Sequence, residues 1–183
     1  MDNGASSYLR FLNGDKDAFV RLVEEYKNGL MLFINTFIRN IHLSEEAADE
    51  TFLKLYVDKP KYKSEYSFKT WLYTIGKNTA VNYLKRNKHR SDAPIEDYFY
   101  VSDNTDIESD YIKGERNIMI HHAINVLKKE YAQVLYLVYF ESLSNEETAK
   151  VMKKSNTQIS DLLYRAKKAL KAELEMRGYD AHL

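Results

Sequence analysis

The chain has 183 residues, 44% of them hydrophobic, which is enough for packed lobes and argues against disorder throughout. Six Gly and two Pro, with long stretches rich in Leu, Lys, Glu and Ala, favour an all-α fold. The lack of Cys excludes disulfides and thiolate metal sites and fits a cytoplasmic location. No apolar run approaches the roughly 20 residues that span a bilayer, so we expect no secretion and no membrane insertion.

The 27 basic and 27 acidic residues are distributed unevenly along the chain. Residues 1–90 carry 15 Lys and Arg against 11 Asp and Glu, and residues 116–183 carry 11 against 8. Residues 91–115 carry eight acidic groups and one Lys. This pattern predicts two mildly basic domains at 1–90 and 116–177, an acidic linker between them, and a C-terminal tail at 178–183.

Three helices are predicted in the first domain. Apolar residues recur every three or four positions from Phe19 to Ile38, as one buried helix face requires, and Asp15 or Asp17 would be the N-cap. This face consists of Phe19, Leu22, Val23, Tyr26, Leu30, Ile34, Phe37 and Ile38.

The second predicted helix begins near Ser44, whose side chain is placed to cap it. Its inner face would use Ala48, Phe52 and Leu55. After a polar loop, a third helix is predicted at 68–85. Its core positions would be Phe68, Leu72, Ile75 and Leu84.

The stretch SDAPIEDYFYVSDNTDIESD follows the first domain and lacks helical or strand periodicity. Its Ser, Asp and Asn content is typical of a tether between domains. Tyr98, Phe99 and Tyr100 form an apolar cluster within it.

The second domain is predicted to contain helices at about 118–127 and 132–140, followed by two short helices with a tight turn between them. Ser144 with Glu147, and Ser155 with Gln158, have the spacing of capping boxes. This is a helix-turn-helix pattern. The predicted core of the two short helices is Thr148, Ala149, Val151, Met152, Ile159, Leu163, Ala166 and Leu170.

No motif of an enzyme, cofactor or metal site is found: the sequence has no Gly-rich phosphate loop, no H-E-x-x-H and no nucleophile elbow. The neighbours His121 and His122 point in different directions on a helix, so we expect surface or partly buried histidines. Glu46, Asp49 and Glu50 share one helix face, which is predicted to be solvated or to dock against a basic partner.

Two helices have the composition of nucleic-acid contacts. The basic run KRNKHR follows Trp71 and Tyr73 on the third helix, and aromatic side chains beside positive charge suit the capture of unstacked bases. Trp71 by itself is more often a core residue. The last helix carries polar and basic side chains around its non-core face, a mixture suited to base edges and phosphates.

Three stretches in this order resemble a bacterial sigma factor of the extracytoplasmic-function (ECF) group of the sigma-70 family. They are EEAADETFLKLY, FKTWLYTIGKNTAVNYLKR, and VLYLVYFESLSNEETAKVM with the helix after it. The resemblance covers nearly the whole chain. It implies a region 2 helical bundle and a region 4 helix-turn-helix on a flexible linker, with core RNA polymerase, promoter DNA and an anti-sigma factor as partners.

The resemblance also implies site residues. Core-polymerase contacts would be Glu46, Asp49, Glu50, Phe52 and Leu53. Contacts to the minus-ten element and its melted strand would be Lys63, Ser64, Ser67, Trp71, Lys77, Asn78, Asn82, Lys85 and Arg86. Contacts to the minus-thirty-five element would be Thr157, Gln158, Ser160, Asp161, Tyr164, Arg165 and Lys168.

The chain departs from many relatives at several of these positions. Relatives often have Gln in place of Asp49, Asp in place of Glu46, Gly in place of Lys153, and basic residues in place of Ser160 and Leu162. The recognition helix is therefore less basic than usual. Fewer phosphate contacts would weaken its salt-dependent affinity for DNA.

Two other functions are left open by the sequence. A dimeric helix-turn-helix regulator would bind duplex DNA without polymerase and would have no need of Trp71 or Asn78. An interaction protein would keep the fold and bind only a regulator. An enzyme comes last, because no nucleophile or metal site is nominated.

Overall fold

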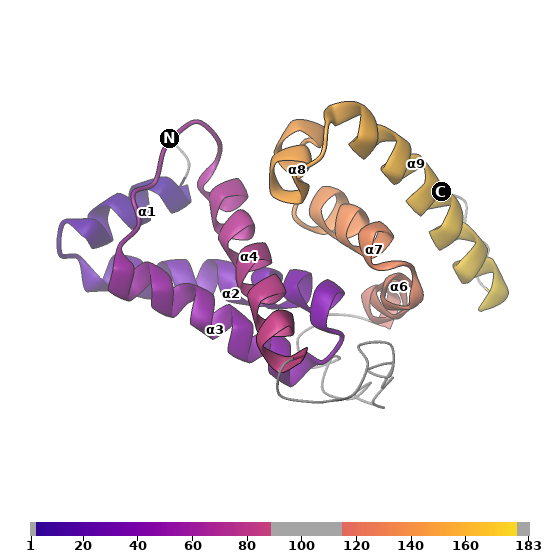
Figure 1. The fold of residues 1–183 in the computed structure, drawn as a ribbon, viewed down its shortest axis with the longest axis horizontal. Helices are drawn as coiled ribbons and strands as arrows, with labels where there is room; N and C mark the ends of the chain where they lie inside the picture. Colours follow the sequence, from indigo (N-terminus) through magenta and orange to yellow (C-terminus); the bar gives the residue numbers. More distant parts are fainter. Residues whose placement is uncertain (1–2, 89–114, 179–183) are drawn as a thin grey trace. The chain divides into compact units, whose positions relative to one another are not determined.

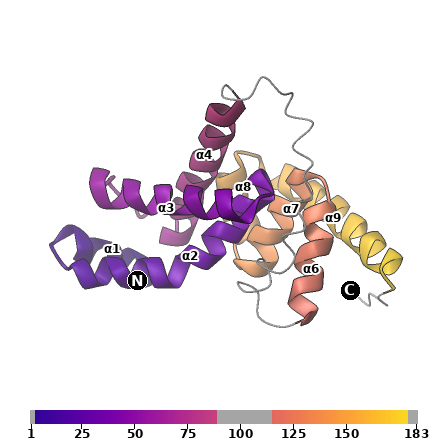
Figure 2. The same cartoon turned by 90° about the horizontal axis from the view of Figure 1, so that it is seen from below.

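The computed structural model describes residues 3–88 and 115–178, and every regular element within them is helical, which confirms the all-α prediction (Figures 1 and 2). The described residues form two compact units, one before and one after the predicted linker. Apart from Glu115 and Gly178, the predicted linker and tail lie outside the described residues, and so does the cluster at 98–100.

The first unit contains α1 (Asn3–Leu12), α2 (Lys16–Ile38), α3 (Ile41–Asp58) and α4 (Phe68–Lys88). The long α2 packs against the other three helices. Asp15 caps α2 by accepting a hydrogen bond from the Ala18 backbone N–H at 3.0 Å, as predicted. Because α2 has neighbours on several sides, its buried surface is wider than one stripe.

Most of the predicted α2 stripe is buried, but Phe19, Val23 and Ile38 are only half-buried. Met31 and Phe33 are fully buried instead. Each lies beside a predicted core position, which is the shift expected when a second helix covers an adjacent face. The pattern located the helix correctly and its buried face only in part.

Two predictions about the first unit were wrong. Helix α1 was not predicted, because only a few of its ten residues, such as Tyr8 and Phe11, mark a buried face. Helix α3 begins at Ile41, with Asn40 as the N-cap that accepts from the Leu43 N–H at 3.1 Å. Ser44 is buried inside the helix, where its hydroxyl donates to the Asn40 carbonyl at 2.7 Å.

Helix α4 begins at Phe68 as predicted and continues three residues beyond the predicted end, to Lys88. Its core positions shift: Ile75 and Leu84 are half-buried, while Tyr73 is fully buried. Gly76 permits close packing against α2, because a Cβ there would lie 2.6 Å from Cδ1 of Leu30. The helix therefore sits tightly on α2 and directs its other side to solvent.

The second unit contains α6 (Glu115–Val126), α7 (Lys129–Leu135), a π-helical turn η2 (Tyr136–Phe140), α8 (Asn145–Met152) and α9 (Asn156–Met176). Helix α9 packs against α6, α7 and α8. The last helix is 21 residues long, so its prediction as a short helix was wrong. The predicted helix 132–140 is divided, with the π-helical turn replacing its second half.

Both capping boxes are present. The Ser144 hydroxyl accepts from the Glu147 N–H, and the Ser155 hydroxyl accepts from the Gln158 N–H, each at 3.2 Å. Between α8 and α9, Lys153 adopts the left-handed conformation with φ of 56°. These local signals fix where both helices of the helix-turn-helix begin.

Two core assignments in the second unit need correction. On α9, Leu162 is buried and Leu163 is half-buried, so the buried face includes Leu162 where Leu163 was predicted. His121, predicted to be at the surface or partly buried, is buried, and its ring centroid lies 4.4 Å from that of Phe140. Burial in this aromatic setting lowers the pKa of His121 to about 4.

Candidate functional site

One face of α3 carries the acidic residues singled out in the sequence. With about 100° of rotation per residue, Glu46, Asp49 and Leu53 lie on the same side of the helix, opposite its buried face. Leu53 is 60% exposed, whereas Phe52 is only 5% exposed. Phe52 therefore lies beneath this surface, and Leu53 is an apolar side chain that α3 exposes beside the acidic residues.

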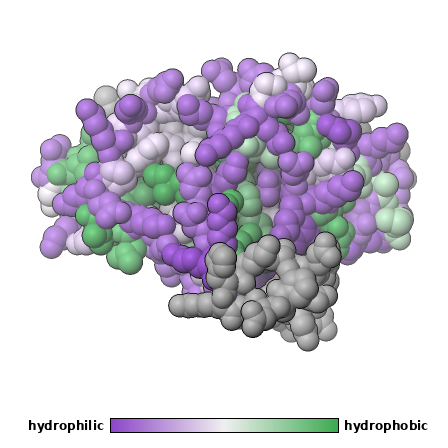
Figure 3. Space-filling model, viewed as in Figure 1, coloured by the Kyte–Doolittle hydropathy of each residue, from purple (hydrophilic) through white to green (hydrophobic). Residues whose placement is uncertain are grey.

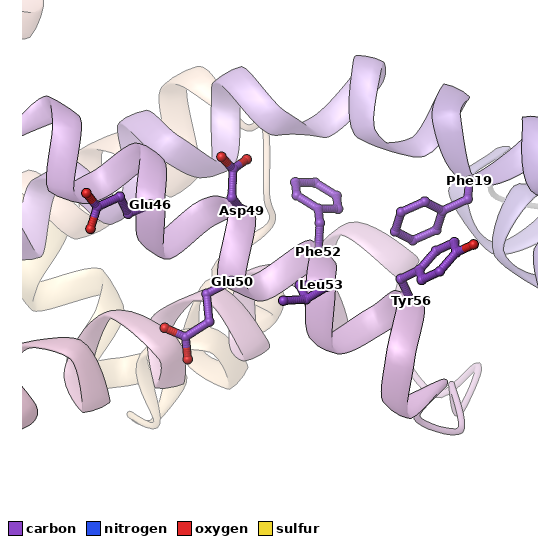
Figure 4. Close-up of a pocket in the computed structure, with 7 residues that line it drawn as sticks. All are labelled: Phe19, Glu46, Asp49, Glu50, Phe52, Leu53 and Tyr56. Carbon is purple, nitrogen blue, oxygen red and sulfur yellow. The ribbon is translucent and has the colours of Figure 1, made fainter.

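An open hollow of about 540 Å³ lies on this face. It is lined by the five residues predicted for this surface and by two that were not, Phe19 and Tyr56. Figure 4 shows the rings of Phe19, Phe52 and Tyr56 grouped toward one end and the carboxylates toward the other. The hollow thus combines an apolar end with an acidic end, which suits a partner with apolar and basic side chains.

Figure 3 shows apolar areas among the polar ones on the surface of the first unit. Val20 on α2 and Val57 on α3 are both more than half exposed. Sequence reasoning missed Phe19 because it was assigned to the core. Tyr56 continues the spacing of Asp49 and Leu53, which was the available signal.

Lys27 on α2 balances part of the acidic charge. Its ammonium lies 2.9 Å from the Asp49 carboxylate and 3.3 Å from that of Glu45. The hydrogen bond to Asp49 is the main cause that raises the pKa of Lys27. Asp49 remains more than half exposed, so it stays accessible to a second partner.

The acidic face of α3 is joined to the end of α4. Arg86 donates to both carboxylate oxygens of Glu50, and the Tyr83 hydroxyl donates to Glu46 at 2.9 Å. Lys54, one turn further along α3, has its ammonium 2.8 Å from Oε1 of Glu50. The Arg86 hydrogen bond is the main cause that holds the pKa of Glu50 below its ordinary value.

Helix α4 presents a second surface. Trp71, Asn78, Asn82 and Lys85 fall within about 60° of one another around the helix axis. Asn78, Asn82 and Lys85 are exposed and Trp71 is half-buried, so together they form one accessible stripe, the α4 stripe. Lys77 and Arg86 were predicted for the same site but lie on opposite flanks of this stripe.

The loop 59–67 leads into the α4 stripe. Lys63 and Ser64 are exposed, whereas Ser67 is half-buried. The Ser67 hydroxyl lies 2.8 Å from that of Thr70 and accepts from the Thr70 N–H at 3.3 Å, so it helps to begin α4. Of these three predicted DNA contacts, Ser67 therefore already has a structural role.

Trp71 is packed against other rings on one part of its surface and exposed on another. Its ring packs against Tyr8, Tyr62 and Phe68, with centroids 5.2, 5.3 and 5.5 Å away. It is nevertheless half-buried and belongs to the α4 stripe. The indole is thus held rigidly at the edge of an exposed surface.

In the second unit, the exposed face of α9 carries Thr157, Asp161, Tyr164 and Lys168 within about 60° of one another. The side chain of Tyr164 is 72% exposed, so most of this aromatic ring is open to a binding partner. The four residues form one stripe opposite the buried side of the helix, the α9 stripe. Such a stripe is what a recognition helix offers to the major groove.

The other residues predicted for α9 lie beside this stripe and have local hydrogen bonds. Gln158 accepts from the Ser155 N–H at 2.9 Å as part of the capping box. Ser160 donates to the Asn156 carbonyl at 3.1 Å, and Arg165 donates to the Asp161 carbonyl at 3.3 Å. Gln158 and Ser160 are therefore the least available of the seven for DNA.

Within residues 3–88 and 115–178, no group of three acidic, His or Cys side chains is arranged to hold a metal ion. No helix in these ranges has the length and apolar character needed to cross a membrane.

Family models and similar proteins all indicate one family. Residues 22–90 match the family Sigma-70 region 2, and residues 117–170 match Sigma-70, region 4. The RNA polymerase sigma-H factor of Pseudomonas aeruginosa is 32% identical over 175 residues, which are 91% of each chain. The ECF RNA polymerase sigma factor SigW of Bacillus subtilis is 25% identical over 170 residues, which are 88% of this chain and 91% of SigW.

Two solved structures share the fold. CnrH in complex with the cytosolic domain of CnrY has a TM-score of 0.68 and 18% identity, over 98% of this chain and 100% of that chain. The sigma factor RpoE in complex with the anti-sigma factor NepR from Bartonella quintana has a TM-score of 0.65 and 19% identity, over 86% of this chain and 96% of that chain. The chain belongs to the ECF group of RNA polymerase sigma factors, the family that directs RNA polymerase in transcription initiation.

Proposed function

We propose that this chain binds core RNA polymerase, recognises a minus-ten and a minus-thirty-five promoter element, and captures melted bases of the non-template strand. The observation that carries the proposal is the α4 stripe. It presents an aromatic ring, two amides and an ammonium on one accessible face, next to an exposed loop. This set of groups suits stacking, base-edge hydrogen bonds and phosphate attraction together.

The hollow on α3 is the proposed docking surface for polymerase. Leu53 would enter an apolar pocket of the partner, while Glu46 and Asp49 would meet basic side chains. Burial of an exposed Leu with its ring neighbours favours association, and the carboxylates would set the orientation. Phe52 would support this surface from below.

Base capture is the proposed mechanism of strand separation. Flipping one base out of the duplex costs a few kcal/mol of stacking and pairing, which a pocket that accepts only the flipped base offsets. Asn78 would hydrogen-bond the base, and Lys63 and Ser64 of the loop would form the pocket wall. Trp71 would stack at the edge of the melted strand, since its ring is already held in place.

The α9 stripe is the proposed reader of the minus-thirty-five element. Asp161 and Tyr164 would contact base edges, and Lys168 would contact phosphate. We infer that Gln158 and Ser160 contribute mainly by holding the start of the helix, because each already has a hydrogen bond there.

Polymerase would supply the affinity that each unit lacks. The excess of four positive charges in residues 1–90 and of three in residues 116–183 is modest for a protein that binds DNA alone. Holding both units on polymerase would make the second promoter contact intramolecular and raise its effective concentration. The acidic segment 91–115 would lie in a basic channel of polymerase later used by RNA.

An anti-sigma factor is a further proposed partner, because the structural relative RpoE is seen with the anti-sigma factor NepR. We propose that the protein acts in the cytoplasm, as a binding protein without catalytic chemistry of its own.

Run-off transcription on genomic DNA fragments with core polymerase tests the proposal. Wild type is expected to start discrete transcripts, and Asn78→Ala is expected to lose them while still binding polymerase. Asn28→Ala is the matched control, because Asn28 is also exposed on a helix of the first unit but belongs to α2. A chain cut after Arg90 is also expected to start none.

The alternative of a helix-turn-helix regulator makes the opposite prediction. It would shift duplex DNA without polymerase, start no transcripts, and be indifferent to Asn78→Ala. That result would replace the base-capture proposal.

A further inference from the structure

Helix α1 is attached to the loop that precedes α4. The Tyr8 side chain is fully buried, and its hydroxyl donates to the Pro60 carbonyl at 2.8 Å, across 52 residues of sequence. Gly4, one turn earlier, allows α1 to approach α4, because a Cβ there would lie 2.5 Å from Cδ1 of Phe68. The contact thus holds the start of the loop 59–67 against α1.

The Tyr8 ring also contacts the residues at the end of this loop. Its centroid lies 5.6 Å from that of Phe68 and 5.2 Å from that of Trp71. Tyr62, within the loop, also packs against Trp71, and its hydroxyl donates to the Tyr66 carbonyl at 2.6 Å. One buried side chain therefore connects the first residues of the loop to the beginning of the α4 stripe.

We propose that Tyr8 is the positioning residue for base capture: it holds the loop 59–67 in the conformation that receives the flipped base. This inference rests on the proposed function of the loop. A preformed pocket binds more tightly than one that must be ordered at each encounter, because the ordering entropy has already been lost on folding. Burial raises the pKa of Tyr8 to about 12, so its hydroxyl remains a donor at neutral pH.

Tyr8→Phe isolates this role, since it keeps the packed ring and removes only the donor to Pro60. Tyr73→Phe is the matched control, because Tyr73 is also fully buried in the first unit but packs on Phe33 of α2. The single Trp of the chain, Trp71, reports on the loop. In the full-length protein, acrylamide should quench Trp71 more strongly in Tyr8→Phe than in wild type or Tyr73→Phe.

Strand capture is measured with the complex of core polymerase and each variant. The probe is the non-template strand of a promoter found by run-off transcription, labelled with 2-aminopurine. Loss of one buried hydrogen bond should weaken capture by Tyr8→Phe about tenfold, with unchanged binding to polymerase and to a duplex minus-thirty-five fragment. Tyr73→Phe should capture the strand as wild type does, because the Tyr73 side chain is fully buried and cannot touch the strand.

The outcomes are distinguishable. Wild-type capture by Tyr8→Phe would overturn the role of Tyr8 and leave the proposed function intact. An equal loss in Tyr73→Phe would overturn it as well, because removing a buried tyrosine hydroxyl away from the loop would then suffice. Failure of wild type itself to capture any strand would overturn the proposed function, and this inference with it.

Discussion

Arg86 on α4 forms a two-point ion pair with Glu50 on α3, with Nη1 3.2 Å from Oε1 and Nη2 2.5 Å from Oε2. The family resemblance assigns these two residues to different partners, Glu50 to polymerase and Arg86 to DNA. The structure instead joins them, so part of the positive charge of Arg86 is already balanced. Lys85, the exposed neighbour of Arg86, forms no ion pair with any residue that the structure describes.

We therefore predict unequal contributions of Lys85 and Arg86 to DNA binding. Lys85→Ala should reduce the slope of log affinity against log salt by about one, as expected when one phosphate contact is lost. Arg86→Ala should reduce it by less. The measurement is binding of the polymerase complex to a promoter fragment at several salt concentrations.

Glu50→Gln serves as the control for that comparison, since it removes the negative charge and keeps the shape. In the Glu50→Gln background, Arg86→Ala should reduce the slope of log affinity against log salt by as much as Lys85→Ala does. Equal slopes for the two alanine variants in the wild-type background would contradict the prediction.

The pH dependence of the pair follows from the lowered pKa of Glu50. Its stabilising contribution is fully present above the ordinary pKa of a glutamate and is lost as the pH falls through the lowered folded-state pKa. We expect Glu50→Gln to remove this acid-dependent part of the stability of the first unit. Urea unfolding followed by Trp71 fluorescence at neutral and acidic pH measures it.

Leu53→Asp is predicted to weaken binding to core polymerase by tenfold or more, because it places a charge where the hollow presents its exposed apolar side chain. Since Leu53 is 60% exposed, the free energy of unfolding should change by no more than about 0.5 kcal/mol. Val126→Asp, an exposed valine on α6, is the control and should bind polymerase normally. A pull-down titration with core polymerase distinguishes the two, and normal binding by Leu53→Asp would exclude this surface.

His121 should make the second unit less stable in mild acid. Its folded-state pKa is about 4 because of burial, and the charge of His122 lowers it further. Between the ordinary pKa of 6.5 and about 4, the unfolded chain takes up a proton that the folded chain does not, so stability falls as the pH falls. From pH 7.5 to pH 5.0 we expect a loss on the order of 2 kcal/mol.

His121→Phe keeps a ring against Phe140 and should remove most of this dependence. Urea unfolding followed by circular dichroism at both pH values measures it, and His42→Phe, at an exposed position of α3, is the control. An unchanged pH dependence in His121→Phe would show that another group is responsible.

Lys153→Gly is predicted to stabilise the second unit by about 0.5–1 kcal/mol, because the left-handed conformation strains every residue with a Cβ. The φ of Lys153 is 56°. Lys154→Gly should instead destabilise the second unit. It removes an ion pair with Glu130 at 2.9 Å and increases the conformational entropy of the unfolded chain. Thermal unfolding of both variants is the measurement, and a lower midpoint for Lys153→Gly would contradict the prediction.

The local signals of the sequence were sufficient for much of the fold. The cap at Asp15, the capping boxes at Ser144 and Ser155, and the beginning of α4 all lie where their residues predict. Each depends on contacts within a few residues, so the sequence pattern contains the whole interaction. Ser44 was misassigned because Asn40 offers the same capping chemistry one turn earlier.

The sequence by itself determined the helical class, the two units and the family, because helix periodicity, caps and motif spacing are properties of short stretches. Only the tertiary structure decided that α1 exists as a helix against α4, that Tyr8 holds Pro60, and that Glu50 pairs with Arg86. It also decided that Phe52 is almost fully buried at the base of the hollow and that Phe19 and Tyr56 line the hollow with it. These contacts join segments more than 30 residues apart in the sequence, and no local pattern specifies which distant side chain will complete a buried cluster or balance a charge.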